Sequence, residues 1–323
     1  MQRTIRWLIG LLLAWNVVPG LHAQQAPYPN RPIKIIITFA PGSGSDAIAR
    51  FVGQGIAKTL GQPVVVESKV GGQGSIGAEY VRRAPPDGYT LVLGGNSTHA
   101  ANLFLVKNLS YDPVRDFVSV SQVTLNPLVL VVRSEVPVNT VKEFLDYVKQ
   151  RPGQINYGVG NSGGRAAVQL LQSLTGIQAQ DVPYAGTSQA ALDMVGGRLD
   201  FMITDPSVVA PFVTQGKLRA LAVSTSVRLP SMPGVPTMIE AGVPGYDYAS
   251  WVGLYLPAKT PQAVVDKLNA AIVQTLKSPE AKEFFTNLGI IPFPSGSEEF
   301  ARFTQEQIEL WGRLVKQAGM QPI

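Results

Sequence analysis

From residue 33 to residue 224, short apolar runs alternate with longer runs of helical periodicity. The apolar runs are KIIITF, VVVE, TLVLG, VLVV, INYG, DVPY, FMIT and LRALAVS. The helices are predicted at residues 45–60, 75–83, 140–151, 164–175, 188–196 and 207–215. Apolar strands separated by amphipathic helices are typical of α/β proteins, whose mostly parallel sheets are flanked by helices on both faces. We therefore predict an α/β fold, followed from Thr260 to the end by a segment that is nearly all helix.

Several of these helices carry clear start signals. Thr140 with Glu143 forms a capping box, and the pairs Thr260–Pro261 and Ser278–Pro279 each place a cap before a first-turn proline. The helix predicted at 45–60 has one apolar face, which we expect to lie on a sheet. This face consists of Ile48, Phe51, Val52 and Ile56.

The first predicted helix opens directly out of a glycine-containing turn, which spans residues 40–46. The start of a helix presents unpaired backbone N–H groups and the positive end of the helix dipole. Both features favour an anion, so an oxygen-rich anion is the first ligand to expect at this turn. The second glycine-rich segment, residues 71–75, lacks the spacing of a phosphate-binding motif, and we interpret it as a turn into a helix.

The N-terminus has the pattern of a secretory signal. Arg3 and Arg6 precede an apolar run at residues 7–15, and Leu21-His22-Ala23 offers a cleavage site. We predict that residues 1–23 are a cleaved signal peptide. A retained membrane anchor is the rival interpretation, but the apolar run is shorter than the roughly 20 residues that a spanning helix needs. The mature protein is then expected to be a soluble periplasmic protein.

Composition excludes several classes. Without residues 1–23 the formal net charge falls from +5 to +3, which is too small for a nucleic-acid-binding protein. With no cysteine, the chain has neither disulfides nor a lipid-attached cysteine. A single histidine, His99, follows the signal, so a histidine-based metal site lacks ligands and we predict no metal and no cofactor. A chain of this length forms two domains more often than one.

Ligands of open α/β sheets bind at the carboxyl ends of the strands, where loops lead into helices. Four such loops here are short and rich in glycine, serine, threonine and asparagine. They are residues 40–46, 94–99, 158–164 and 184–188. We expect these loops to line one cleft.

Motifs along the whole chain resemble one known family. They include FAPGSGSDAIARFVGQGIAKTLG, PPDGYTLVLGGNSTHAAN, LSYDPVRDFVSVSQV, DVPYAGTSQAALDMVGGRLDFM, GKLRALAVST, VPTMIEAGVPGYDYASWVGLYLPAKTP and WGRLVKQAG. In this order they are similar to the Bug-type receptors of tripartite tricarboxylate transporters. The resemblance implies a two-lobed periplasmic-binding-protein-like fold of type II with a hinged cleft. It also implies a monomeric solute-binding receptor, not an enzyme, that captures a small carboxylate and delivers it to integral-membrane transporter subunits.

The resemblance further implies a discontinuous first lobe, made of residues 27–124 with 249–323, and a second lobe made of residues 125–248. In the family, a ligand carboxylate is held by backbone amides, small hydroxyls and waters from both lobes, which is physically reasonable because fixed N–H groups replace its hydration. On the first lobe the matching positions are Phe39, Ala40, Pro41, Gly42, Ser43, Gly44, Ser45, Asp46, Asn96, Ser97, Thr98 and His99. On the second lobe they are Tyr157, Gly158, Asn161, Tyr184, Ala185, Gly186, Thr187, Thr204 and Asp205.

Three charged residues in this set have two interpretations each. Asp46 either caps its own helix or contacts the ligand. Asp205 either caps the helix at 207–215 or contacts a donor group on the ligand. Arg165 follows a loop that departs from the family pattern, and it either pairs with a second acidic group in the cleft or is a solvated surface residue. The aromatic residues Phe39, Tyr157, Tyr184 and Trp251 either flank an aromatic ligand or pack in the core.

A secreted hydrolase acting on a small anionic substrate is the alternative function. A catalytic triad would have to use His99, the single histidine that follows the signal, as its base. We therefore expect His99 to be a loop hydrogen-bonding residue. The sequence leaves open which carboxylate is bound.

Overall fold

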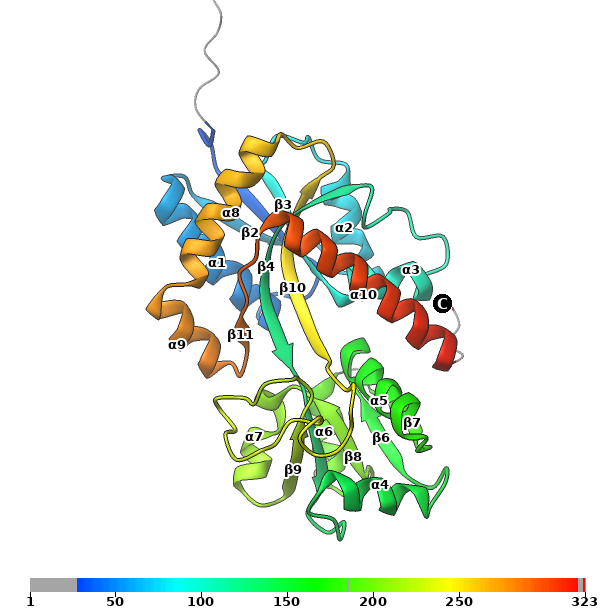
Figure 1. Ribbon diagram of the computed structural model, residues 1–323. Coiled ribbons are helices and arrows are strands. Elements are labelled where there is room, and N and C mark those ends of the chain that lie inside the picture. The colour runs from blue at the N-terminus through cyan, green and yellow to red at the C-terminus, as the bar shows by residue number, and fades with distance from the viewer. Residues whose placement is uncertain (1–27, 185, 319–321, 323) are drawn as a thin grey trace, which may run out of the picture.

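The protein was analysed as a computed structural model, which describes residues 28–184, 186–318 and 322. The signal peptide predicted at residues 1–23, and Ala185, lie outside the described residues. Two β-sheets form two lobes, one above the other in Figure 1. We call the lobe that contains the N-terminal strand the first lobe and the other the second lobe.

The sheet of the first lobe has the order β11-β4-β10-β3-β1-β2. Its strands are β1 (Ile33–Ile37), β2 (Val64–Ser68), β3 (Thr90–Gly95), β4 (Phe117–Pro127), β10 (Ala249–Pro257) and β11 (Ile291–Pro292). Its helical elements are α1 (Gly44–Leu60), η1 (Gly72–Gly74), α2 (Ser75–Arg82), the π-helical turn η2 (Ser97–Ala101), α3 (Asn102–Leu105), α8 (Gln262–Leu276), α9 (Pro279–Asn287) and α10 (Ser297–Ala318).

The sheet of the second lobe has the order β7-β6-β8-β5-β9. Its strands are β5 (Val129–Arg133), β6 (Asn156–Val159), β7 (Gln180–Pro183), β8 (Phe201–Thr204) and β9 (Leu218–Val223). Its helices are α4 (Val141–Lys149), α5 (Ser162–Thr175), α6 (Thr187–Val195) and α7 (Pro206–Thr214).

Strand alternation explains how each sheet is covered by helices on both faces. Successive side chains of a strand point to opposite faces. In β1, Ile35 and Ile37 belong to the core beneath α1 and α8, whereas Ile36 belongs to the core on the α2 and α10 side. In β5, Leu130 and Val131 divide between two cores in the same way. The predicted α/β class with helix-covered sheets is confirmed.

The lobes are joined by two long neighbouring strands, β4 and β10 (Figure 1). They pair antiparallel from Phe117 opposite Pro257 to Pro127 opposite Ala249. Ser224 is buried directly after β9 and hydrogen-bonds to both crossings. Its hydroxyl oxygen accepts from the Leu128 N–H at 2.8 Å, and its O–H donates to the Tyr248 carbonyl at 2.6 Å. Sheet membership changes between β4 and β5 and again between β9 and β10, and the exact lobe boundaries stay a prediction.

Some local details differ from the expectation. The sheets are mixed, because the crossing strands and β5 run against their neighbours, while β1–β2, β1–β3, β6–β7 and β6–β8 are parallel. Phe51 does not lie on the sheet but stacks on Phe284 of α9 with ring centroids 4.4 Å apart. The cap of α8 is Pro261, since the Thr260 hydroxyl instead donates to the Pro257 carbonyl at 2.8 Å. Ser278 caps α9 as predicted.

Gly95 is required where β3 meets the crossing strand, because a Cβ at this position would lie 2.2 Å from the carbonyl oxygen of Trp251. A backbone oxygen cannot move aside without disturbing the β3–β10 pairing. We expect Gly95→Ala to lower the free energy of unfolding by about 1–3 kcal/mol, as overpacking does. Gly234→Ala is the control, because a Cβ at residue 234 would have no atom within 4 Å. Urea denaturation of both variants measures the difference, and equal stabilities would contradict this account.

Candidate functional site

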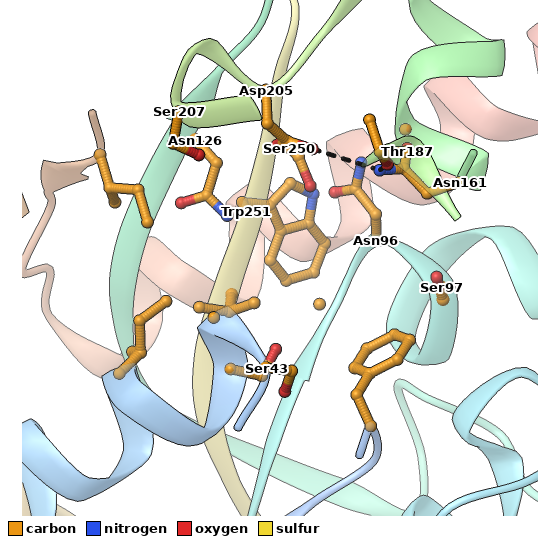
Figure 2. A pocket seen from close by; sticks show the side chains of 18 of the residues that line it. Ser43, Asn96, Ser97, Asn126, Asn161, Thr187, Asp205, Ser207, Ser250 and Trp251 are labelled. Atoms are coloured by element: carbon orange, nitrogen blue, oxygen red, sulfur yellow. Dashed lines mark hydrogen bonds between the residues drawn. The ribbon is translucent and has the colours of Figure 1, made fainter. Parts of the chain in front are cut away.

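A cavity of about 720 Å³ lies between the lobes, at the ends of β3, β6 and β8 and beside the crossing strands. Eleven of the predicted residues line it: Phe39, Ser43, Gly44, Ser45, Asn96, Ser97 and Thr98 from the first lobe, and Asn161, Gly186, Thr187 and Asp205 from the second. Figure 2 shows Ser43 and Asn96 facing Asp205 and Thr187 across this space. The tertiary structure therefore brings together loops that lie far apart in the sequence.

The first-lobe side of the cavity contains the start of α1. Its N-cap, Ser43, is extended, and the Asp46 N–H donates to the Ser43 hydroxyl at 3.4 Å. The first intrahelical bond runs from the Ala47 N–H to the Ser43 carbonyl. The amides of Gly44 and Ser45, which both line the cavity, precede that bond and have no partner inside the helix.

The second-lobe side contains the starts of three more helices. The cavity is lined by Ser162 and Gly163 at the first turn of α5, by Thr187 and Ser188 of α6, and by Ser207 of α7. The N-terminal amides of a helix have no intrahelical partner, and its dipole favours negative charge. The N-termini of four helices, α1, α5, α6 and α7, thus converge on one cavity.

Asn161 links the three second-lobe helices. Its side-chain oxygen accepts from the Gly164 N–H at 2.8 Å and so caps α5. Its side-chain NH₂ group donates to the Thr187 hydroxyl at 3.3 Å and to the Asp205 carboxylate at 3.4 Å, as the dashed lines in Figure 2 show. One side chain therefore holds the starts of α5, α6 and α7 in a fixed arrangement.

The lobes also touch directly at the cavity. The hydroxyls of Ser97 and Ser162 lie 3.2 Å apart, which is hydrogen-bonding distance. The Asn96 side-chain NH₂ group donates to the Tyr248 hydroxyl at 3.0 Å, next to the return crossing. These contacts hold the two sides of the cavity close together in this conformation.

The charge of the cavity is unusual for an anion site. Among the described residues that line it, Asp205 is the only one with an ionisable side chain. Burial raises the pKa of the Asp205 carboxyl, and the hydrogen bond from Asn161 opposes this shift. Its side chain makes no capping bond to α7, whose first residue is Pro206 and has no N–H. Asp205 therefore occupies the N-cap position of α7 without a side-chain capping bond, and its carboxylate is available to the cavity.

The side chain of Asp46 bonds to other groups of the protein. Its carboxylate accepts from the Gly42 N–H at 2.9 Å and pairs with Arg50 at 2.9 Å. The hydrogen bond from Gly42, followed by that from Arg50, lowers the pKa of Asp46. Asp46 is absent from the cavity lining among the described residues, so its contacts shape the turn that precedes α1.

Other predicted residues also lie outside the described lining: Ala40, Pro41, Gly42, Tyr157, Gly158, Arg165, Tyr184 and Thr204. Tyr157 is fully buried, and its hydroxyl accepts from Gln169 at 3.1 Å. The Tyr184 hydroxyl donates to Asp193 at 2.9 Å. Neither tyrosine lines the cavity, although Gly160 and Gly186, two or three residues further along the chain, do.

Arg165 is not among the residues that line the cavity, which agrees with its interpretation as a surface residue. Its guanidinium pairs with Asp181 of β7 at 2.6 Å, and both side chains are about a third exposed (38% and 31%). The Arg165 guanidinium is therefore already paired with a carboxylate of the protein.

We expect Arg165→Ala to change the affinity for any bound organic acid by less than twofold, because the side chain pairs with Asp181 and does not line the cavity. Isothermal titration calorimetry on the wild type and the variant measures this. A tenfold loss for a dicarboxylate alone would show instead that Arg165 leaves Asp181 and binds the second acidic group.

Several lining residues were not singled out for binding from the sequence. Asn126 and Ser250 lie at the two crossings. Trp251, by contrast, was among the aromatic residues named from the sequence, and it lies in the middle of the cavity wall in Figure 2. The predicted lobe boundaries, at residues 124/125 and 248/249, lie next to Asn126 and Ser250 and could have indicated them as cavity residues. Leu288, Gly289 and Ile290 follow α9, and no local pattern marks them as cavity residues.

His99 is a buried structural residue. Its ring stacks on Tyr255 with centroids 3.7 Å apart, and its Nδ1 lies 2.9 Å from the Thr98 hydroxyl. Its Nε2 is buried without a partner among the described residues. Burial lowers the pKa of His99 to about 3, so the ring is neutral at physiological pH. His99 is not among the lining residues, which leaves it no direct role in the cavity.

This burial has a consequence for acid stability. The unfolded chain protonates His99 below a pKa of about 6.5, whereas the folded protein resists protonation down to about 3. Between these values the unfolded state binds more protons, so stability falls as the pH falls, by up to about 1.4 kcal/mol per pH unit from this residue.

We expect His99→Gln to flatten this dependence between pH 6.5 and 4.5, even if the variant is less stable at pH 7. Urea denaturation at a series of pH values measures both slopes. An unchanged slope would show that His99 is not the group responsible.

Metal sites and membrane-spanning helices are both absent from the described part of the chain. Its residues contain no group of three or more histidine, cysteine or acidic side chains placed to hold a metal ion. None of the helices within those residues combines the length and apolar character needed to cross a membrane.

Comparison with known proteins identifies the class. Residues 48–320 match the model of the tripartite tricarboxylate transporter family receptor. The chain is 32% identical to protein BugT of Bordetella pertussis, over 97% of this chain and 96% of that protein. It is therefore a member of this family, which consists of substrate-binding receptors and not of enzymes.

Solved structures agree with this assignment. A protein of R. palustris, solved with adipate, has a TM-score of 0.80 and 32% identity, covering 92% of this chain and 100% of that one. MatC from Rhodopseudomonas palustris, solved with bound malate, has a TM-score of 0.74 and 34% identity, covering 89% of this chain and 100% of that one. Both the predicted family and the predicted two-lobed fold are confirmed.

Proposed function

We propose that this protein is a periplasmic receptor that captures a small organic acid between its two lobes and delivers it to the membrane subunits of a tripartite tricarboxylate-type transporter. Family membership supports the receptor role. Two similar structures contain adipate and malate, which are both carboxylates. We also propose that the N-terminal signal is cleaved. A monomeric state is proposed because one chain supplies both sides of the cavity.

The observation that carries the proposal is the convergence of four helix N-termini on a cavity without a lining arginine or lysine among the described residues. Fixed N–H groups replace the hydration of a carboxylate with little reorganisation. Because these groups do not titrate, the site stays attractive to anions over a wide pH range. The amides of Gly44 and Ser45 on the first lobe, and those of Ser162, Gly163, Thr187 and Ser188 on the second, are the proposed anchors.

Transport requires that ligand occupancy change the shape of the receptor. The amides that we propose for binding belong to both lobes, so a ligand is bound fully only when the lobes are close together. The paired strands β4 and β10 are the connection about which such closure occurs. A ligand that binds the closed form better shifts the population toward it, and the transporter then distinguishes loaded from empty receptor.

A thermal-shift screen tests the ligand class. Ligands that bind only the folded state raise its stability, by about 2.7 kcal/mol at a concentration one hundred times the dissociation constant. We expect organic acids to stabilise the protein, and neutral sugars of similar size to have no effect. Stabilisation by sugars or cations and by no acid would overturn the proposal.

One backbone amide can be removed without breaking the fold. Gly44 is the first residue of α1, where proline is well tolerated, and Ser43 before it is already extended (φ −73°, ψ 166°), as a residue before proline must be. No atom lies within 4 Å of a Cβ at residue 44. We expect Gly44→Pro to bind the acid about tenfold more weakly, as loss of one charge-assisted hydrogen bond predicts, with an unchanged melting temperature in the absence of ligand.

Gly44→Ala is the matched control, because it adds a Cβ at the same position and keeps the N–H. Calorimetric titration of the three proteins measures the effect. Equal affinities for the proline and alanine variants would show that the Gly44 amide does not bind the acid.

A further inference from the structure

The single carboxylate of the cavity has no positive partner in the protein. None of the ion pairs formed within the described residues includes Asp205. Its contact with the Asn161 side-chain NH₂ group is long, at 3.4 Å, and that group is shared with Thr187. A partly desolvated carboxylate without a cation is unfavourable unless something else supplies the missing charge.

The side-chain oxygen of Asn96, in the same cavity, has no hydrogen-bond donor among the described residues. Asn96 is 5% exposed and lines the cavity. Its NH₂ group is used by Tyr248, whereas its oxygen Oδ1 is buried without a hydrogen-bond partner among the described residues. Figure 2 shows the Asn96 side chain extending toward the side of the cavity from which Asp205 projects. Asn96 comes from the first lobe and Asp205 from the second, so they line one cavity only because the lobes are close together.

The cavity lining also holds a buried donor without a partner, Trp251 Nε1, and a further acceptor, Asn126 Oδ1. None of these neutral atoms supplies the positive charge that a carboxylate pairs with, so a cationic donor is the complement of Asp205 and of the Asn96 oxygen together. An ammonium group has three N–H donors and a positive charge, and it therefore pairs with the Asp205 carboxylate and the Asn96 oxygen together. From these contacts we propose that Asp205 and Asn96 form an ammonium subsite, and that the ligand is an amino acid or another small zwitterion with one amino and at least one carboxylate group. This inference rests on the proposed function, because the helix N-termini still bind the carboxylate.

The same geometry disfavours an acid without an amino group. A second carboxylate placed at this end of the cavity would meet Asp205, and two like charges in a partly desolvated site repel each other unless one takes up a proton. A neutral apolar end would leave the Asn96 oxygen without a donor and the Asp205 carboxylate with only its long hydrogen bond from Asn161, which also costs free energy. Asp205 is thus the residue that we expect to distinguish an amino acid from its des-amino counterpart.

Matched pairs of acids test the subsite. Each pair differs by one amino group: L-aspartate and succinate, L-glutamate and glutarate, 4-aminobutyrate and butyrate, L-phenylalanine and 3-phenylpropanoate. Dissociation constants are measured by isothermal titration calorimetry on the full mature protein. We expect the tightest ligand of the panel to carry the amino group, and to bind at least tenfold more tightly than its des-amino partner.

The variant Asp205→Asn keeps the shape of the side chain and removes its charge. We expect it to weaken the tightest amino ligand at least tenfold, and to leave the des-amino partner unchanged or more tightly bound. Asp181→Asn is the control, because it removes the same charge from a carboxylate that pairs with Arg165 away from the cavity. Melting temperatures of the unliganded variants show whether both are folded.

The outcomes separate this inference from the proposed function. If the tightest ligand lacks an amino group, or if Asp205→Asn changes the amino ligand by less than twofold, the ammonium subsite is wrong and the carboxylate receptor stands. If no acid of either kind binds, both proposals fail.

Discussion

The antiparallel pairing of β4 with β10 is the interaction on which the rest of the structure depends. The chain runs toward the second lobe along β4 and returns along β10, and Ser224 hydrogen-bonds to Leu128 and Tyr248, the residues next to the two strands. The two crossings lie side by side, the lobes also contact each other through α10 and α5, and the cavity lies between the lobes. The cavity and the meeting of loops from distant parts of the chain both follow from this connection.

The second constraint is electrostatic. The described lining of the cavity has helix N-termini and no arginine or lysine. In the proposed function, backbone amides of α1, α5 and α6 bind the carboxylate that all candidate ligands share. In the proposed subsite, Asp205 and Asn96 bind the amino group, so affinity and selectivity would depend on different groups. This separation suits a family whose similar members have been solved with different acids, adipate and malate.

Buried polar groups around the cavity have a supporting role. Asp46 and Asn161 use their side chains to satisfy backbone amides beside or at the helix starts, which fixes the turns that carry the free amides. His99 stacks on Tyr255 behind the first-lobe wall and is kept neutral by burial. These residues look like binding or catalytic groups in the sequence because polar residues in glycine-rich turns have both uses. Only their partners in the folded chain tell the uses apart.

The sequence by itself determined the elements and the family. Apolar periodicity and cap signals predicted the strands and most helix limits, since these depend on interactions within a few residues, and the motifs identified the receptor family. Only the tertiary structure decided which side chains enter the cavity. Arg165 and Tyr184 sit in loops predicted to bind, yet Asp181 and Asp193 hold them elsewhere. Gly289 reaches the cavity from a segment without any local signal. The physical reason is that the direction of a side chain depends on partners far away in sequence, such as Tyr248 for Asn96 and Asn161 for Asp205.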